Sequence, residues 1–272
     1  MIRRTIPSSG EKLPVIGIGT WQVFDVNADK YPVVQNVLEV LHKGGGTLID
    51  TSPMYAKAEK VIGEVTSVME SRNDFFYATK VWTYGAEQGI FQMQASMEKM
   101  KRQTIDLVQI HNLVNWKRHL AGLRKWKEEG KIRYIGLTHY KEEHHEELER
   151  VMKAEKPDFV QFNYSVTERH AEKRLLDAAL DLGIATLINR PFGSGSLFHL
   201  VRGKPLPKWA SENGIESWAA YFLKYIMAHP AVTSVIPATA NPHHESDNVR
   251  AALGPLPDSY LRLKMVEYLM HL

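Results

Sequence analysis

Short apolar runs alternate with amphipathic stretches along the whole chain. Eight runs have the length of buried strands, and they lie at residues 15–19, 47–50, 75–79, 107–111, 134–138, 159–162, 185–188 and 234–236. Apolar residues recur at helical spacing in the stretches between and after them, at residues 31–43, 59–70, 89–102, 118–129, 142–155, 170–182, 217–228 and 242–252. This alternation predicts repeated βα units and a parallel sheet.

Three segments fall outside the repeat. The opening IRRTIPSSGEKLPVI has two short apolar arms around Ser-Ser-Gly-Glu and predicts a β-hairpin. Residues 257–272 predict a Pro-initiated helix of mixed character that packs against the outer ring. Residues 192–214, rich in Gly, Pro and Ser, form the longest irregular stretch and predict a mobile loop. At 272 residues the chain suits one α/β barrel, so we predict a single domain over residues 1–272.

Composition narrows the class of protein. Hydrophobic residues make up 44% and charged residues 24%, a globular balance with ample core material. The formal charge is only +3, and basic residues are interleaved with acids as in KEEHHEELERVMKAEK, so we do not expect nucleic acid as a partner. Cysteine is absent, which excludes disulfides and thiolate chemistry. No signal peptide and no run of ~18 apolar residues is evident, so we expect a cytoplasmic protein, monomeric or weakly homo-oligomeric, without a membrane.

Four polar residues stand at or just past the ends of apolar runs. Asp50 ends TLID, Tyr55 follows in TSPMYAKAE, Lys80 follows FFYAT, and His111 ends IDLVQIH. A parallel barrel presents its chemistry at its strand ends, so we expect the four side chains to converge on one rim. Tyrosine alone is a poor acid with a pKa of about 10, but a lysine ammonium beside its oxygen favours the phenolate, and an aspartate can hold that lysine charged. The set suits proton donation to a carbonyl oxygen that the imidazole binds.

Each of these residues also has a simpler interpretation. Tyr55 could be a packed loop tyrosine, and His111 a strand-end histidine with local hydrogen bonds. Lys80 is expensive to bury unless Asp50 pairs with it, and a lysine at such a place could instead form a Schiff base in a lyase or aldolase. The other eleven histidines show neither H-x-H nor H-E-x-x-H spacing, so we expect no metal site.

Six segments surround or accompany the four residues in chain order, and the second of them contains Asp50 and Tyr55: LPVIGIGTW, DTSPMYAKAE, GKIRYIGLTHY, QFNYS, RPFGSG and SVIPATANPHHESDN. With them the chain resembles the aldo-keto reductases, whose catalytic tetrad is an Asp, Tyr, Lys and His in this order. The resemblance implies a (β/α)₈ TIM barrel whose bottom is plugged by the N-terminal hairpin. It also implies an oxidoreductase that reduces a small-molecule aldehyde or ketone to the alcohol, with Tyr55 as proton donor, Lys80 and Asp50 tuning it, and His111 orienting the carbonyl.

The resemblance also implies a nicotinamide cofactor, NADP(H) by family habit, with NAD(H) as the alternative. No G-x-G-x-x-G fingerprint lies between a strand and a helix, which fits a dinucleotide extended across the barrel rim beneath the 192–214 loop. The family's cofactor contacts map onto Thr20, Trp21, Asp50, Thr138, His139, Gln161, Arg190, Pro191, Phe192, Gly193, Ser194, Ser196, Ala238, Thr239, Ala240, Asn241, His244, Asp247 and Asn248.

The chain departs from the family pattern at three places. Thr138 and His139 stand where the family commonly has the Ser-Asn pair that holds the carboxamide. Residues 189–191 read Asn-Arg-Pro at the position of the aromatic residue that stacks on the nicotinamide ring. Ala238 and His244 align with the lysine and arginine that grip the 2′-phosphate in many NADP-dependent members. Discrimination between the two cofactors is therefore expected to be weak.

The substrate pocket is the least determined part of the site. Its expected border is aromatic and largely apolar, which suits a hydrophobic or aromatic carbonyl compound, although the same residues could simply pack the rim. These residues are Trp21, Met54, Trp82, Asn112, Val114 and Trp116. The rival function is a cofactor-binding sensor or regulatory subunit with the same fold and little turnover, against which the intact tetrad counts.

Overall fold

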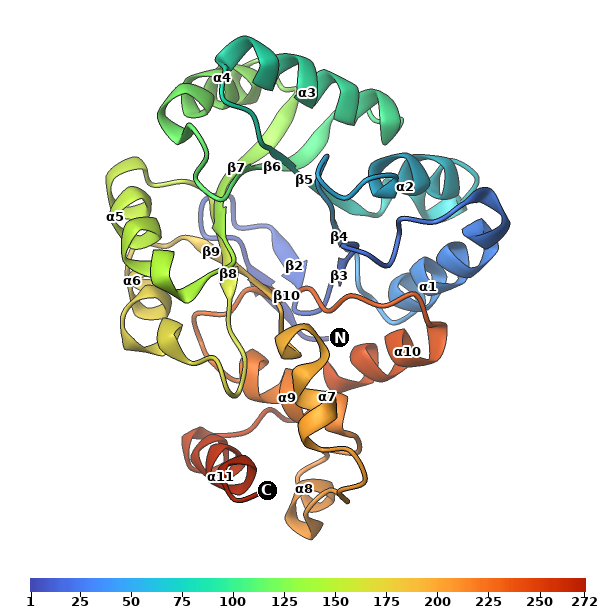
Figure 1. Cartoon of the computed structure of the whole chain (residues 1–272), viewed down its shortest axis with the longest axis vertical. Helices are drawn as coiled ribbons and strands as arrows, with labels where there is room; N and C mark the ends of the chain where they lie inside the picture. Colours follow the sequence, from blue (N-terminus) through green and yellow to red (C-terminus); the bar gives the residue numbers. More distant parts are fainter.

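The computed structural model describes residues 1–272. Eight parallel strands, β3 to β10, follow one another in chain order around a barrel (Figure 1). Isolated bridges join Ile16 to Val235 and Gly19 to Ala238, so the first and last strands nearly close the ring. The strands are β3 Ile18–Gly19, β4 Leu48–Asp50, β5 Phe76–Val81, β6 Ile105–His111, β7 Ile132–His139, β8 Phe159–Asn163, β9 Ala185–Asn189 and β10 Ser234–Val235. The predicted (β/α)₈ barrel is confirmed.

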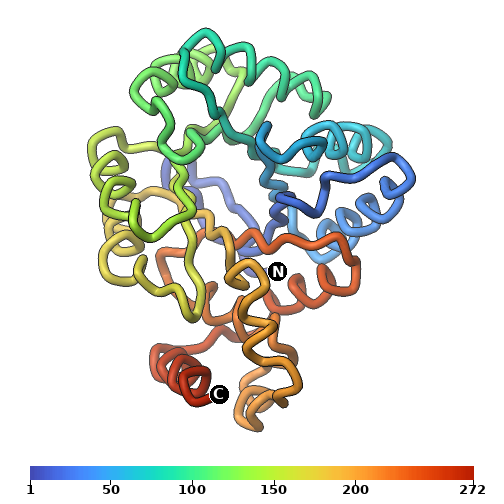
Figure 2. Tube along the Cα trace, viewed as in Figure 1, coloured from blue at the N-terminus to red at the C-terminus, as the bar shows by residue number.

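Eight helices surround the barrel, and their apolar faces pack against the strands (Figures 1 and 2). They are α1 Tyr31–Lys43, α2 Ala58–Thr66, α3 Ala86–Lys99, α4 Trp116–Glu128, α5 His145–Glu155, α6 Leu175–Asp181, α9 Trp218–Met227 and α10 Pro242–Ala251. Three more, α7 Ser196–Leu200, α8 Lys208–Glu212 and α11 Ser259–Met270, lie outside the repeat. Helices α8 and α11 project from one side of the barrel, and the C-terminus lies beside α11 (Figure 2).

Several element boundaries differ from those predicted. The first strand is only two residues long, because residues 15–17 meet β10 through an isolated bridge and not a continuous ladder. The expected helix at 59–70 ends at Thr66, where the Thr66 and Ser67 hydroxyls donate to the Ile62 and Glu64 carbonyls. The expected helices at 142–155 and 170–182 each begin with a separate 3₁₀ turn, η3 Glu142–His144 and η4 His170–Lys173. Further 3₁₀ turns lie at η1 Ala28–Lys30 and η2 Glu70–Asn73.

The segment 192–214 was predicted to be irregular, and that prediction was wrong. It contains the 3₁₀ turn η5 Gly193–Gly195 followed by α7 and α8. Leu197, Val201 and Ala210 are buried in the main core and fix these short helices. Phe192 also packs on Phe198 with ring centroids 4.8 Å apart. Apolar contacts made across the fold therefore outweigh the local preference of the Gly, Pro and Ser residues.

An N-terminal hairpin closes the bottom of the barrel. Its strands β1 Arg3–Thr5 and β2 Lys12–Pro14 pair antiparallel. Ile6 and Leu13 are buried against the inward-facing residues of the barrel strands, so the predicted plug is confirmed. That apolar cluster also contains Leu48, Phe76, Ala78, Leu107, Tyr134, Phe159, Ala185, Leu187 and Ile236.

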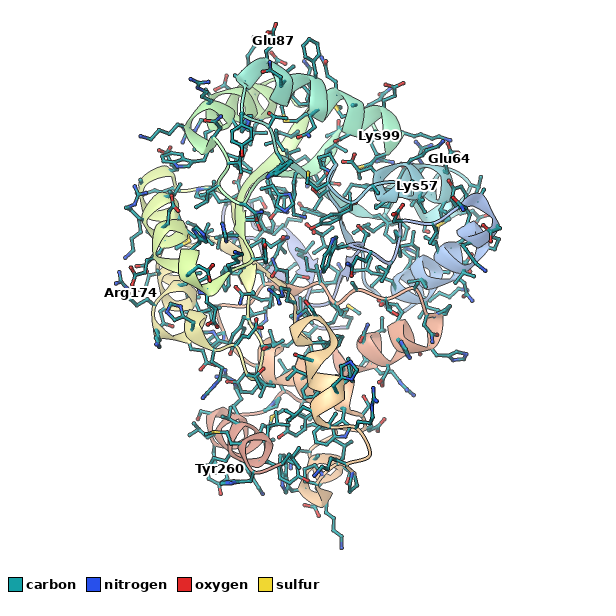
Figure 3. The ribbon with its side chains drawn as sticks, viewed as in Figure 1. Lys57, Glu64, Glu87, Lys99, Arg174 and Tyr260 are labelled. Atoms are coloured by element: carbon teal, nitrogen blue, oxygen red, sulfur yellow. The ribbon has the colours of Figure 1, made fainter.

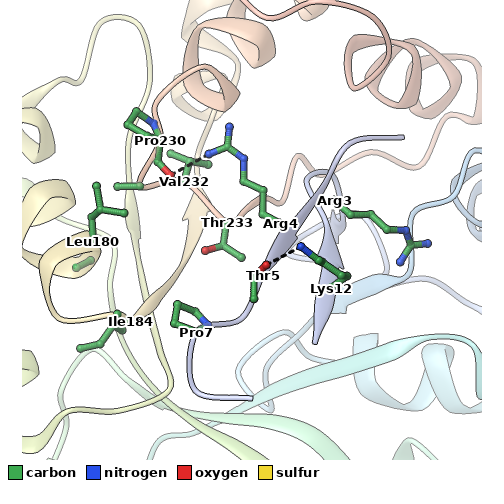
Figure 4. A pocket seen from close by; sticks show the side chains of 13 residues that line it. Arg3, Arg4, Thr5, Pro7, Lys12, Leu180, Ile184, Pro230, Val232 and Thr233 are labelled. Carbon is green, nitrogen blue, oxygen red and sulfur yellow. Dashed lines mark hydrogen bonds between the residues drawn. The ribbon is translucent and has the colours of Figure 1, made fainter. Parts of the chain in front are cut away.

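A pocket of about 280 Å³ lies beside the hairpin (Figure 4). Arg4 lines it and donates to the carbonyls of Met227, His229 and Pro230, at distances from 2.6 to 3.0 Å. Lys12 donates to the Thr5 hydroxyl at 2.8 Å. Lys12 therefore links the two strands of the hairpin, and Arg4 links the hairpin to the C-terminal end of α9 and the residues after it.

The outer surface carries charges of both signs. Figure 3 shows Glu64, Glu87, Lys99 and Arg174 on or beside the ring of helices, with Lys57 further inward at the start of α2. Acids and bases pair between neighbouring helices, as where Arg124 of α4 contacts Glu155 of α5 at 2.8 Å. No helix is both long and apolar enough to cross a membrane. The helices thus present mixed polar faces outward around the buried strands.

Candidate active site

Polar side chains collect at the carboxyl ends of the barrel strands, on top of the apolar cluster. Strand side chains alternate between faces with period two, so the inward positions of β6 include Leu107, Gln109 and His111. The lower of these is apolar and the upper two are polar. In β5 the inward Ala78 is likewise followed by Lys80. The alternation therefore places a polar layer over an apolar floor.

Asp50 and Lys80 form a buried ion pair in this layer. Lys80 Nζ donates to Asp50 Oδ2 at 2.6 Å and to the Thr51 carbonyl at 2.8 Å, and the lysine side chain is only 1% exposed. Burial opposes the charged ammonium, but the nearby Asp50 and Tyr55 outweigh it, so the pKa of Lys80 is raised. Lys80 is therefore an ammonium at neutral pH.

Tyr55 lies beside this pair, in the loop between β4 and α2. Its N–H donates to the Ser52 carbonyl at 2.9 Å, which holds the residue in a turn. Lys80 Nζ lies 5.1 Å from the centroid of the Tyr55 ring. Burial raises the pKa of the Tyr55 phenol, the Lys80 charge pulls the pKa down, and the net direction is upward. The phenol thus keeps its proton at neutral pH, because burial outweighs the effect of Lys80 on which the sequence argument relied.

His111 ends β6 and meets Tyr55 edge-on, with ring centroids 6.1 Å apart. Its Nδ1 lies 3.2 Å from Ser52 Oγ. Burial first, and then the positive charge of Lys80, lower the pKa of His111 to about 3. The imidazole is therefore neutral, and the structure brings all four predicted catalytic side chains into one site.

Two glutamines complete the surroundings of Asp50. Gln109 and Gln161 each donate an Nε2–H to Asp50 Oδ1 at 2.9 Å, while Lys80 occupies Oδ2. Gln161 was expected beside the nicotinamide, whereas Gln109 was not predicted at all. Its position two residues before His111, on the same strand face, is the signal that could have found it. Gly136 leaves room for Gln109, because a Cβ on that glycine would lie 2.7 Å from the Gln109 Cγ.

The expected nicotinamide contacts lie at the strand ends around the tetrad. The buried Thr20 hydroxyl donates to the Asp50 carbonyl at 3.1 Å, and the Thr138 hydroxyl donates to Gln161 Oε1 at 3.2 Å. His139 is 6% exposed, and burial followed by the nearby His144 lowers its pKa to about 4. Thr138 and His139 thus stand together at the end of β7, and His139 is neutral.

The expected pyrophosphate segment begins at the end of β9. Arg190 has a left-handed backbone with φ of +50°, and its Nε donates to Ser194 Oγ at 3.2 Å. Gly195 has φ of +94°, a conformation that favours glycine, and a Cβ there would meet nothing within 4 Å. The Oδ1 of Asn189 is buried without a hydrogen-bond partner. Beyond it run the other expected contacts, Pro191, Phe192, Gly193 and Ser196.

The expected adenosine end lies at the start of α10. Asn241 caps this helix through the His243 N–H, and His244 is exposed in the first turn. Asp247 pairs with Arg250 at 3.5 Å, so this arginine is engaged by an acid. Asn248 is buried and donates to Glu245. The remaining expected contacts, Ala238, Thr239 and Ala240, form the segment that leads into the helix.

The expected substrate border consists mostly of side chains with open surface. Trp21 is 50% exposed and Met54 is 44% exposed, and both follow the ends of barrel strands. The loop after His111 is unusual, because Asn112, Leu113 and Asn115 all have positive φ near +50°. Such backbone conformations cluster at functional sites. Trp82, Val114 and Trp116 are half-buried around this loop and after β5.

Comparison with known proteins places the chain in a family. Residues 15–263 match the model of the Aldo/keto reductase family, and the chain belongs to it. The chain is 26% identical over 257 residues to the methylglyoxal reductase YeaE of Escherichia coli, covering 91% of this chain and 89% of that protein. It is 24% identical to the NADH-specific methylglyoxal reductase of the same organism, covering 78% and 73%. A solved aldo/keto reductase from Klebsiella pneumoniae, in complex with NADP and acetate, superposes with a TM-score of 0.83 at 22% identity, covering 98% and 95%.

Proposed function

We propose that this chain, as a single domain over residues 1–272, reduces an aldehyde or a ketone to the alcohol with a nicotinamide cofactor, or runs the reverse oxidation. The observation that carries the proposal is that three ionisable side chains, Tyr55, Lys80 and His111, lie together in one site. A phenol that keeps its proton lies beside a buried ammonium and a neutral imidazole. Family membership supports the same reaction class.

The residues divide the proton chemistry among them. The hydride for the carbonyl carbon would come from a reduced nicotinamide bound at the rim. Tyr55 gives its proton to the carbonyl oxygen as negative charge develops there. The Lys80 ammonium stabilises the phenolate that remains, and Asp50 keeps that ammonium charged and in place. His111 is neutral and donates a hydrogen bond to the same oxygen, which positions the carbonyl.

The residues at the rim fit a dinucleotide. The unpartnered Asn189 Oδ1 stands ready to accept a hydrogen bond, and the open space at Gly195 lets backbone approach a ligand closely. We propose that NADP(H) is used with only a modest preference over NAD(H). A 2′-phosphate normally needs an arginine or lysine, whereas Ala238 and His244 supply no permanent cation and Arg250 is paired with an acid. The relatives include both an NADP-bound structure and an NADH-specific enzyme.

Schiff-base chemistry at Lys80 is disfavoured by the same geometry. Attack on a carbonyl requires a neutral amine, but Lys80 is held as an ammonium 2.6 Å from the Asp50 carboxylate. Borohydride with a carbonyl substrate should therefore leave no adduct on the chain. A trapped adduct at Lys80 would replace the reductase proposal by a lyase or aldolase.

A substrate panel tests the proposal. Purified protein with NADPH or NADH is offered methylglyoxal, other short aldehydes and ketones, and aromatic aldehydes, and loss of the nicotinamide absorbance is followed. The relatives' names point to dicarbonyls, and the exposed Trp21 and Met54 offer an apolar wall for larger compounds. We expect turnover with at least one class. Cofactor binding without turnover on any member of the panel would favour the sensor or regulatory subunit.

A further inference from the structure

The Ser52 hydroxyl lies between the turn that carries Tyr55 and the imidazole of His111 at the end of β6. Ser52 is fully buried in the turn after β4, three residues before Tyr55. Its Oγ accepts the Met54 N–H at 3.2 Å and lies 3.2 Å from His111 Nδ1. Its backbone carbonyl accepts the Tyr55 N–H at 2.9 Å. One small residue therefore contacts both the proton donor's turn and the imidazole.

The hydrogen bonds around Ser52 determine where its proton goes. The Oγ already accepts the Met54 N–H, and the only other partner of this hydroxyl in the protein is the Nδ1 of His111. A buried hydroxyl needs an acceptor for its own proton, and Nδ1 is the only one within reach. The Ser52 O–H therefore donates to Nδ1, which must carry a lone pair.

That assignment fixes the tautomer of the imidazole. His111 is neutral, since burial and then Lys80 lower its pKa to about 3, so a single proton is shared between its two ring nitrogens. With Nδ1 as acceptor, the proton lies on Nε2, since the hydrogen bond to Ser52 at Nδ1 is the only one that the ring makes within the protein. A protonated Nε2 donates to a carbonyl oxygen, whereas an unprotonated one would repel it.

We propose that Ser52 is a positioning residue that holds His111 as the Nε2–H tautomer and turns this N–H towards the substrate carbonyl. Its effect on turnover rests on the proposed reductase function, but its effect on the tautomer does not. Ser52→Ala removes the donor to Nδ1 and frees the ring to rotate or to move its proton. Loss of one neutral hydrogen bond to the carbonyl corresponds to about a tenfold fall in kcat, with KM for the cofactor unchanged.

The tautomer is measured directly in the resting protein. Nitrogen-15 spectra of histidine-labelled protein distinguish a protonated Nε2 from a protonated Nδ1, and His111→Asn identifies the signal. We expect Nε2–H in the wild type at pH 7 and a shift towards Nδ1–H or a mixture in Ser52→Ala. Ser52→Thr keeps the hydroxyl and should keep the wild-type tautomer. A wild-type His111 protonated on Nδ1, or a spectrum unchanged by Ser52→Ala, would overturn the proposal without touching the reductase assignment.

A double-mutant cycle separates positioning from simple loss of packing. Ser52→Ala is compared in the wild-type and His111→Asn backgrounds on the best substrate of the panel. If Ser52 acts through the imidazole, its effect on kcat should largely vanish once His111 is replaced. An equal effect in both backgrounds would contradict the proposal. Ser96→Ala is the matched control, because Ser96 is a buried serine in α3 whose hydroxyl contacts the Gln92 carbonyl and Glu59 but none of the four catalytic residues.

Discussion

Glu245 is a destabilising residue in the core, because it places a carboxyl group on the buried face of α10. It shares that face with Asn248 and Val249, at positions where an amphipathic helix normally carries apolar residues. The residue is fully buried, Oε1 has no hydrogen-bond partner, and Oε2 accepts only the Asn248 Nδ2–H at 3.2 Å. Burial raises the pKa of the Glu245 carboxyl to about 8. It therefore folds as the protonated acid at neutral pH.

The pH dependence of stability follows from that proton. The unfolded carboxyl ionises around its ordinary pKa of 4.5, whereas the folded one holds its proton until about pH 8. Between these values the unfolded state binds fewer protons, so stability falls as the pH rises. The free energy of unfolding falls by about 1.4 kcal/mol for each pH unit above 4.5. The total loss is about 3 kcal/mol at pH 7, and it stops growing above pH 8. Below pH 4.5 there is no cost.

Glu245→Gln removes the ionisable group and keeps an oxygen to accept from Asn248. Removal of the ionisable group alone would raise the free energy of unfolding by about 3 kcal/mol at pH 7 and by nothing near pH 4.5. The unpaired amide N–H of the new glutamine costs about 1 kcal/mol at all pH values. We therefore expect the variant to be about 2 kcal/mol more stable than the wild type at pH 7 and about 1 kcal/mol less stable near pH 4.5. Urea unfolding followed by tryptophan fluorescence at several pH values between 4.5 and 8.5 measures the difference.

The control is Glu267→Gln, which changes an exposed acid on α11 that has no ion pair. Its stability should track the wild type across the whole range. If the free energies of unfolding of Glu245→Gln and the wild type instead differed by the same amount at pH 5 and pH 8, the Glu245 carboxyl would titrate alike in the folded and unfolded states, and its burial would not raise its pKa. The reasoning above would then fail.

Tyr55→Phe should lower kcat by about 10²- to 10⁴-fold and leave the dissociation constant of the cofactor nearly unchanged, and retention of more than half the wild-type rate would contradict its role. Tyr260→Phe, on the exposed face of α11, is its control. Adding Lys80→Met to Tyr55→Phe should cost little more than either change alone, because the two act as one unit; additive losses in kcat would argue against this. The preference for NADPH over NADH, measured as dissociation constants, should be modest, because Ala238 and His244 supply no permanent cation; a hundredfold preference would mean that a permanent cation reads the phosphate. Arg262→Met should lower the free energy of unfolding by about 3 kcal/mol, since Arg262 Nη2 donates to Glu172 at 2.6 Å and ties α11 to the barrel; a urea midpoint equal to that of the wild type would refute this.

The fold was readable from the sequence because its signals are local. Eight apolar runs separated by helical patterns specify βα units, and each run needs only its own neighbours in the chain to be recognised. Segment 192–214 is the exception. Leu197 and Ala210 in this segment are buried in the main core, which is formed by residues distant in sequence. No local pattern in the sequence predicts these contacts.

In the candidate site, the positions of the four catalytic residues could be predicted from the sequence, but their protonation states could not. Asp50, Tyr55, Lys80 and His111 were predicted because strand ends of a parallel barrel face one rim and because their types suit one reaction. Their protonation states were not predictable, since burial is a property of the folded molecule. The sequence suggested that Lys80 would favour the Tyr55 phenolate, whereas burial leaves the phenol protonated.

The sequence by itself determined the barrel strands and the helices between them, their order, and which four side chains stand at or just past the strand ends. The tertiary structure alone decided the second layer of contacts: Gln109 reaching Asp50 across 59 residues, Ser52 reaching His111 across 59, and the acid of Glu245 enclosed beneath α10. These contacts depend on strand register and on how helices settle against the barrel. Chain neighbours specify periodicity, but only closure of the barrel brings groups so far apart in sequence within hydrogen-bond distance.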